Sequence, residues 1–188
     1  MEEGDLMLCP ICKSAVLEDK ELEGGLRTAV CPVCSGSWVR YPDYEEWKNN
    51  DHTNIDTGNF KIKEEGRESK KACLCPDCGR IMIKHRVSAK LPFMLDHCNS
   101  CGGIWLYRGE WESIMASGLH LRVNEFFTTE WQDCIREEMT RTRLEEKYKT
   151  RFGKENYLRL KEIREWIRSD VHKDEIIAFL IDDDPYKV

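Results

Sequence analysis

Four C-x2-C pairs, grouped two by two, constrain the fold of this chain of 188 residues more than any other feature. The first copy reads "CPIC" and then "CPVC", and the second reads "CPDC" and then "CNSC". The pairs lie 18 residues apart in the first copy and 19 apart in the second. Both gaps fit the spacing of a four-cysteine zinc site. We therefore expect two zinc ions, one per copy, with eight ligands: Cys9, Cys12, Cys31, Cys34, Cys75, Cys78, Cys98 and Cys101.

A four-thiolate site also explains how so short a segment can fold. Each C-x2-C turn brings two thiolates to one side of the backbone, and two such turns complete a tetrahedron. The residues between the turns suit two short antiparallel strands, and "EGG" at residues 23–25 marks the turn in the first copy. A unit of about 40 residues buries too little apolar surface to fold alone, so the metal takes the place of a core. Rubredoxin-like iron is the alternative metal that the spacing leaves open.

The similarity of the two copies runs beyond the cysteines, at an offset of about 66 residues. The aligned pairs are Trp38 with Trp105, Gly36 with Gly103, Val39 with Leu106, Asp43 with Glu110, Tyr44 with Trp111, and Trp47 with Ile114. This is the pattern of a duplicated unit. Gly102, directly after Cys101, permits a positive φ where the chain leaves the metal site.

The pattern divides the chain into four segments. They are a first metal unit at 1–48, a linker at 49–72, a second metal unit at 73–118 and a helical region at 119–188. The linker is polar and charged, and we interpret it as mobile, with a short strand at Phe60–Lys63. The predicted fold class is α+β, small and metal-stabilised, with short antiparallel hairpins that are each followed by a short helix.

Helical periodicity replaces the cysteine pattern after Gly118, and it predicts about three helices. The first runs from Asn124 to Gly153, with Asn124 or Thr128 as its N-cap and Gly153 after its end. Apolar stripes follow its sequence and that of the next helix, "KENYLRLKEIREWIRS", and a short apolar helix, "HKDEIIAFLI", comes last. We expect these helices to pack together as a small bundle. The alternative is that part of their apolar surface docks on a partner.

Composition narrows the functional classes. The formal net charge is -6, charged residues make up 34% of the chain and the mean hydropathy is -0.61. Four-thiolate zinc sites add further negative charge, which weighs against generic binding to phosphate backbones. The N-terminus lacks the pattern of a signal peptide, and no apolar run approaches the ~18 residues that span a bilayer. Ten cysteines in a reducing compartment favour metal binding, so we expect a cytoplasmic protein without a membrane partner.

The second copy resembles the transcription-factor-IIB-type zinc ribbon family. The residues that carry the resemblance are Cys75, Cys78, Cys98, Cys101, Gly103, Trp105, Leu106, Gly109 and Glu110. The first copy is a weaker match, with Ser35, Pro42 and Asp43 at positions where the family has Gly, Gly and Glu. The resemblance covers roughly residues 6–48 and 73–118. It implies tandem zinc ribbons that bind zinc, and by analogy of fold it points to transcription machinery.

Catalysis is not expected. Four cysteine ligands close a zinc site to water and substrate, and the chain has no HExxH, Walker or nucleophile-elbow motif. Glu110 is the one residue that invites a general-base role. It follows Gly109 and opens a short helix, where a carboxylate is favoured for structural reasons. We therefore expect no small-molecule substrate.

The sequence favours a zinc-binding adaptor or accessory factor that recognises a protein partner or a multi-subunit complex through the ribbons and the helical tail. The alternative is a nucleic-acid-binding protein that acts through the basic second ribbon and linker, with aromatic side chains that stack on bases. The candidate partner-binding residues are Lys84, Arg86, Lys90, Tyr107, Arg108 and Trp111.

Overall fold

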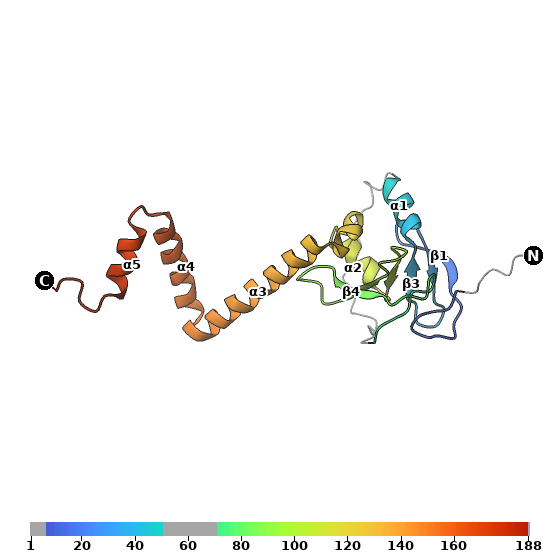
Figure 1. The fold of residues 1–188 in the computed structure, drawn as a ribbon, viewed down its shortest axis with the longest axis horizontal. Coiled ribbons are helices and arrows are strands. Elements are labelled where there is room, and N and C mark those ends of the chain that lie inside the picture. The colour runs from blue at the N-terminus through green and yellow to red at the C-terminus, as the bar shows by residue number, and fades with distance from the viewer. Residues whose placement is uncertain (1–6, 51–70, 188) are drawn as a thin grey trace, which may run out of the picture. The chain divides into compact units, whose positions relative to one another are not determined.

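The computed structural model describes residues 7–50 and 71–187 (Figure 1). The chain divides into two compact units, Met1–Arg136 and Glu137–Val188. Both cysteine repeats lie in the first unit, so the compact units do not coincide with the four segments predicted from the sequence. The strand predicted at Phe60–Lys63 lies outside the described residues.

Each repeat forms the predicted hairpin and helix, with a third strand between them that was not predicted. The first repeat, ribbon 1, contains β1 (Glu18–Leu22), β2 (Leu26–Val30), β3 (Ser37–Val39) and α1 (Tyr41–Asn49). The second repeat, ribbon 2, contains β4 (Ile83–Arg86), β5 (Met94–His97), β6 (Ile104–Leu106) and α2 (Glu110–Ala116). A 3-10 helix, η2 (His120–Phe127), and the long helix α3 (Thr129–Phe152) follow.

The β1–β2 hairpin shows why the first repeat folds where the sequence predicted. The strands pair antiparallel from Glu18↔Val30 to Leu22↔Leu26. Gly24 and Gly25 form the turn with φ values of 85° and 78°, a conformation that residues with a Cβ atom rarely adopt. The turn predicted at residues 23–25 is therefore confirmed.

The two ribbons share one sheet. Its strand order is β1-β2-β3-β6-β5-β4, so the ribbons meet where β3 pairs antiparallel with β6. At the centre of that pair Trp38 lies opposite Trp105, its own counterpart in the repeat. Ribbon 1, in blue, and ribbon 2, in green and yellow, therefore lie side by side about a pseudo-two-fold axis (Figure 1).

A reciprocal contact between tryptophan and glycine fixes this junction. A Cβ atom on Gly36 would lie 2.3 Å from the Trp105 ring, and one on Gly103 would lie 2.1 Å from the Trp38 ring. Each indole therefore covers the glycine of the other ribbon, and both indoles are fully buried. A buried tryptophan removes about 150–250 Å² from water, which outweighs the hydrogen bonds of so short a strand pair.

The sheet separates two cores. On one face the tryptophans of β3 and β6 pack with the metal-site cysteines, Leu17, Ala29 and Met82. On the other face α1, α2 and η2 cover the sheet, and Trp47 of α1 meets Trp111 of α2 edge to face at 5.3 Å. This alternation follows from the pleat, which sends successive side chains of a strand to opposite faces.

Helix α3 begins within the first unit. Thr128 Oγ1 accepts a hydrogen bond from the Trp131 N–H, so Thr128 caps the helix, one of the two caps predicted. Trp131 packs against the helix-side core, and Ile135 is the last buried residue among those described. Asn124, the other predicted cap, lies in η2, so the predicted helix is a 3-10 segment followed by an α-helix.

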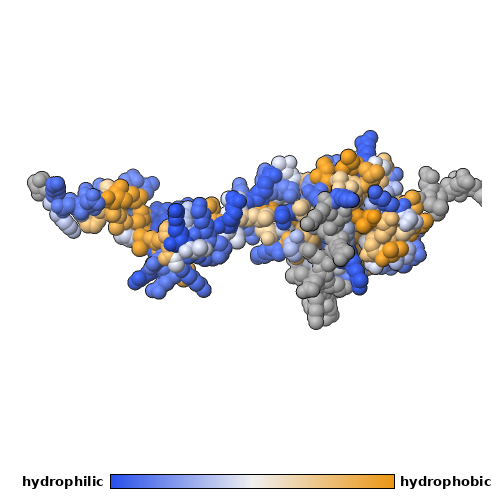
Figure 2. Space-filling view, turned by 90° about the horizontal axis from the view of Figure 1, so that it is seen from below, coloured by the Kyte–Doolittle hydropathy of each residue, from blue (hydrophilic) through white to orange (hydrophobic). Residues whose placement is uncertain are grey.

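The second unit contains the rest of α3, α4 (Lys154–Ser169) and α5 (Lys173–Ile181), so the prediction of about three helices is confirmed. No described side chain in this unit is buried, and Figure 2 shows apolar surface gathered over α4 and α5. The predicted bundle is therefore wrong. Only Gly153 separates α3 from α4, whereas antiparallel helices need a connection of about 2–5 residues to pack along their lengths.

Candidate metal centres

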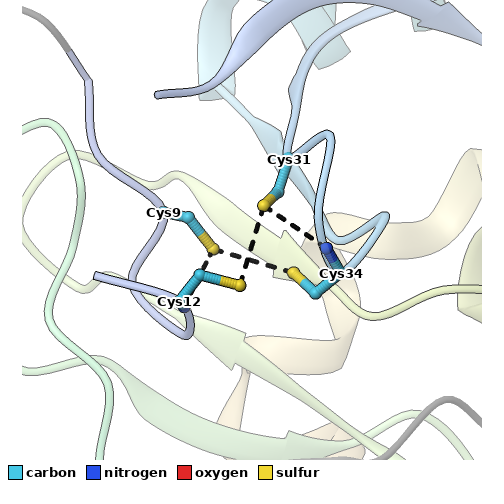
Figure 3. Close-up of side chains that lie close together, drawn as sticks. All are labelled: Cys9, Cys12, Cys31 and Cys34. Atoms are coloured by element: carbon cyan, nitrogen blue, oxygen red, sulfur yellow. Dashed lines mark hydrogen bonds between the residues drawn. The ribbon is translucent and has the colours of Figure 1, made fainter. Parts of the chain in front are cut away.

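The first cluster lies where the chain enters β1 and where it leaves β2. Its ligand atoms are the sulfurs of Cys9, Cys12, Cys31 and Cys34, all within 4.8 Å of one another (Figure 3). The sulfurs of Cys9 and Cys34 are 3.7 Å apart, and those of Cys12 and Cys31 are 3.9 Å apart. Two turns of the backbone thus point four thiols at one centre.

The second cluster repeats this arrangement in ribbon 2 with Cys75, Cys78, Cys98 and Cys101. The sulfurs of Cys75 and Cys101 are 3.5 Å apart, and those of Cys78 and Cys98 are 3.4 Å apart. Tetrahedral coordination with zinc–sulfur bonds of about 2.3 Å requires sulfur separations of about 3.8 Å. Both clusters therefore fit a tetrahedral metal ion of the size of zinc.

One backbone turn recurs at all four C-x2-C pairs. The carbonyl of the first cysteine accepts a hydrogen bond from the residue after the second cysteine, and this residue has a positive φ. The four residues are Lys13, Ser35, Gly79 and Gly102. The positive φ predicted at Gly102 is confirmed, at 75°. Ribbon 1 adopts the same turn with Lys13 and Ser35, where an L side chain is strained.

The turns also direct backbone N–H groups at the sulfurs. The N–H of Cys12 donates to the Cys9 sulfur at 3.3 Å, and that of Cys78 donates to the Cys75 sulfur at 3.4 Å. These bonds favour the thiolate, but burial opposes them and raises the pKa of Cys9 to about 11. Burial opposes thiolate formation at Cys98 too, but there hydrogen bonds from backbone N–H groups and from the Cys78 and Cys101 thiols together outweigh it and lower the pKa to about 7.

The donor set decides what the clusters can do chemically. Four thiols within bonding distance of one centre, all buried or half-buried except the exposed Cys78, stabilise a divalent cation, which in turn holds them as thiolates. Four protein ligands fill a tetrahedral ion's coordination shell, which is the arrangement of structural zinc sites. When bound, zinc would supply cross-links between the two turns of each ribbon.

Residues 74–117 match the model of the transcription factor zinc-finger family. Ribbon 2 is a zinc ribbon of the transcription-factor-IIB type. The match ends within one residue of α2, so it covers the metal site, the three strands and the helix of ribbon 2. Comparison with curated proteins and with solved structures gave no match.

The two clusters and this match together support tandem ribbons that hold two zinc ions, as predicted. Ribbon 1 lies outside the matched residues, but its cysteine cluster and its strands repeat those of ribbon 2. The structure thereby confirms the predicted α+β fold with two metal sites. None of the described helices combines the length and the apolar character needed to cross a bilayer.

The structure places the candidate partner surface in two groups. Tyr107 and Trp111 are buried, with exposed fractions of 6% and 2%, and the Trp111 indole donates to the Glu23 carbonyl. Lys84 is half-buried and pairs with buried Asp96 at 2.9 Å. The exposed members are Lys90 and Arg108, and Arg86 is half-buried. The role of these six residues with a partner stays a prediction.

Glu110 has a structural position. Its carboxylate accepts a hydrogen bond from the Tyr107 N–H at 2.8 Å, and its own N–H bonds to the Tyr107 carbonyl. The pair closes the turn from β6 into α2. Glu110 is 2% exposed, as expected for a residue that organises the start of a helix.

Cys73, Cys134 and His97 are not among the ligands of the two clusters. Cys73 is buried beside the Tyr107 hydroxyl, and Cys134 is exposed on α3. His97 stacks on Phe127 with ring centroids 3.9 Å apart, and burial lowers its pKa to about 4. It is therefore a packing histidine.

The residues that join the ribbons are not among the predicted site residues. Trp38 Nε1 donates to a carboxylate oxygen of Asp77, inside the first C-x2-C turn of ribbon 2, at 2.9 Å. Arg40 pairs with the same carboxylate at 3.5 Å. The signal that could have found the junction is the repeated Gly-x-Trp spacing, present in both copies as Gly36–Trp38 and Gly103–Trp105.

Proposed function

We propose that the protein is a non-enzymatic, zinc-binding adaptor or accessory factor that recognises a protein partner or a multi-subunit complex. The two ribbons provide a rigid, zinc-stabilised body, and the helices after Ile135 provide a recognition surface. The family of ribbon 2 makes a task related to transcription the favoured one. The observation that carries the proposal is that no described side chain after Ile135 is buried.

The helical tail, residues 136–187, is rich in the apolar side chains that helices usually bury. Its exposed large apolar residues are Met139, Leu144, Tyr148, Phe152, Leu158, Leu160, Ile163, Trp166, Val171, Ile177, Phe179, Leu180, Ile181 and Tyr186. Helices of this length gain most of their stability from packing of an apolar face. Extended exposed apolar surface is typical of a site that another protein covers. These properties support a tail that docks on a partner.

A non-catalytic role is supported by the two metal sites. Each offers four cysteine sulfurs to one ion, which leaves no coordination position for water or substrate. Glu110, the residue that invited a general-base role, is buried and bonded to the backbone of the turn before α2.

Protein recognition is favoured over nucleic-acid binding because three of the side chains that could contact a nucleic acid are engaged or buried. Lys84 forms an ion pair with Asp96, and its ammonium also lies 5.3 Å from the Tyr107 ring centroid. Tyr107 and Trp111 are too deeply buried to stack on bases.

Affinity purification from the native host, with nuclease treatment, tests the proposal. Ile163→Ser with Trp166→Ser removes two apolar side chains of α4, and Glu162→Ser with Glu165→Ser is the matched control on the same helix. We expect one protein partner to co-purify in a stoichiometric amount with the wild-type chain and the control. The apolar double variant should lose it while keeping both zinc ions.

Two results would contradict the proposal. One is a partner that binds the apolar double variant as well as the wild-type chain. The other is binding to random single-stranded DNA or RNA whose affinity falls steeply with salt, which would favour the nucleic-acid alternative.

A further inference from the structure

The pseudo-two-fold axis relates two grooves on the helix side of the sheet, and the chain fills one of them with its own residues. We call this one the filled groove: it lies over β4 and β5, and η2 and the first turn of α3 occupy it. Phe127 stacks on His97 and meets His85 edge to face at 5.4 Å. The Trp131 indole donates to the Val87 carbonyl at 2.9 Å.

Polar contacts hold the same segment along the edge of ribbon 2. The side-chain amide of Gln132 donates to the carbonyl of Arg86 and accepts from its N–H. β4 is an edge strand, so these bonds pair backbone groups at the border of the sheet. On α1, the Tyr44 hydroxyl bonds to the backbone of η2, and Asn124 donates to the carboxylate of Glu45.

The registers of the two hairpins identify the equivalent positions in ribbon 1. Trp38 and Trp105 are counterparts, and both hairpins pair antiparallel around them. Counting outward along the paired strands gives four equivalents: Lys20 for His85, Glu21 for Arg86, Leu22 for Val87 and Val30 for His97. The sequence alignment of the two repeats adds two on the helices: Trp111 for Tyr44 and Glu112 for Glu45.

All six of these equivalents line one groove of about 620 Å³, which we call the open groove. Six positions that contact the chain's own segment in the filled groove thus have counterparts that line the open groove. Its floor is apolar at Leu22, Val30 and Leu106, and the edge strand β1 forms its outer border.

We propose that the open groove binds a short helical segment of another protein that carries an aromatic anchor and a net positive charge. The inference rests on the proposed function in that both take the partner to be a protein. The helical form follows from the filled groove, where a 3-10 turn and the start of an α-helix fit the same backbone frame. An aromatic anchor is expected because Val30 and Leu22 stand where ribbon 2 has His97 and Val87. In the filled groove these two residues contact the aromatic side chains of Phe127 and Trp131.

The positive charge follows from the border of the open groove. Glu21 stands where ribbon 2 has Arg86, so the sign of the charge at this position is reversed. Glu23 adds a second exposed carboxylate, and the lining as a whole carries Glu21, Glu23 and Glu112 against Lys20 and Arg108, a net charge of -1. Lys20 is paired with Glu18 at 2.9 Å. The chain's own segment carries Glu125, Glu130 and Asp133 against Arg122, a net charge of -2, so the same segment of a second copy is a poor occupant on charge grounds.

Selection of random peptides displayed on phage, with the zinc-loaded full chain as target, tests the inference. The peptide enriched most strongly is then synthesised and titrated into isotopically labelled full chain by NMR. We expect it to contain an aromatic residue and a net positive charge, and to shift resonances of Leu22, Val30 and Trp111. Shifts at α4 and α5 instead would overturn the groove proposal, and the tail would remain as the recognition surface.

Charge variants on one strand sharpen the test. Glu21→Lys should weaken peptide binding by about tenfold or more, because it places a positive charge against the peptide. Glu23→Lys, in the turn, should act in the same direction without touching the strand pairing. Asp19→Lys makes an equal change of net charge on β1 away from the groove lining, so its affinity should stay near that of the wild-type chain.

Zinc content and the unfolding midpoint of each variant establish that it is folded. Equal affinity for all three variants would overturn the inference, and so would an enriched peptide without positive charge. Groove resonances that shift with protein concentration alone would identify a second copy as the occupant and would also overturn it.

Discussion

The junction of the ribbons depends on four residues that come in two equivalent pairs. Gly36 and Gly103 have no side chain, and Trp105 and Trp38 occupy the space that a Cβ atom would need. The same four residues look like parts of two separate units in the sequence. The structure shows that each tryptophan completes the other ribbon's packing, which is why a Gly-x-Trp spacing occurs in both copies.

Gly103→Ala tests this contact. The added methyl would lie 2.1 Å from the Trp38 ring, so the indole or β3 must move. We expect a loss of about 3 kcal/mol in the free energy of unfolding, at the upper end of overpacking effects. Denaturant unfolding at fixed free zinc measures it. The control is Gly79→Ala, which meets no atom within 4 Å and should cost only about 1 kcal/mol for its positive φ. Equal losses would contradict the interlock.

Substitution of Asp77 gives a second test at the scale of single residues, because its carboxylate accepts the hydrogen bond of the buried Trp38 indole. Asp77→Ala leaves that N–H without its acceptor and should destabilise the chain by about 1–3 kcal/mol. Asp77→Asn keeps an acceptor oxygen and should recover most of the loss. Thermal unfolding of the two zinc-loaded variants decides the matter, and an alanine variant as stable as the asparagine variant would show that the bond contributes nothing.

At the scale of elements, local features were predictable and connections between them were not. The C-x2-C turns, the turn at residues 23–25 and the cap Thr128 each depend on residues close in sequence, so their chemistry is visible in the sequence alone. The left-handed residues Lys13 and Ser35 were missed, because neither is a glycine. They adopt the strained conformation since the metal-site turn of ribbon 1 is the same as that of ribbon 2.

The helical tail shows the opposite limit. Its apolar periodicity predicted the helices, but periodicity does not say what covers an apolar stripe. A bundle was the default expectation for three amphipathic helices. The single residue Gly153 between α3 and α4 prevents such packing, and its effect depends on the helix boundaries, which a sequence pattern defines poorly.

Ending the chain after Glu145 tests whether the tail contributes to the stability of the ribbons. Because Ile135 is the last buried residue in the described part of the chain, this truncation should change the free energy of unfolding of the ribbon unit by less than about 0.5 kcal/mol. Both zinc ions should remain bound. Ile135→Ala in the full chain is the control and should cost about 2–4 kcal/mol. Loss of zinc or of a cooperative transition on truncation would show that the tail supports the fold.

At the scale of the whole molecule, the two ribbons are one folding unit with two metal sites. A single zinc ribbon of this size depends on its metal for stability. Here each ribbon also depends on the other, because the β3–β6 pair, both tryptophans and the Trp38–Asp77 bond cross the junction. The sequence could not reveal this coupling, since the repeats are separated by residues 49–72 and nothing in their pattern requires them to pair.

Stepwise removal of zinc, followed by native mass spectrometry of the full chain, tests the central claim most directly. The wild-type chain should carry two zinc ions. As a chelator is added, the chain with two ions should give way to the chain with none, and the species with one ion should stay minor because loss of one site unfolds the shared junction. A wild-type chain with fewer than two zinc ions, or a stable one-zinc species that dominates midway, would contradict the account.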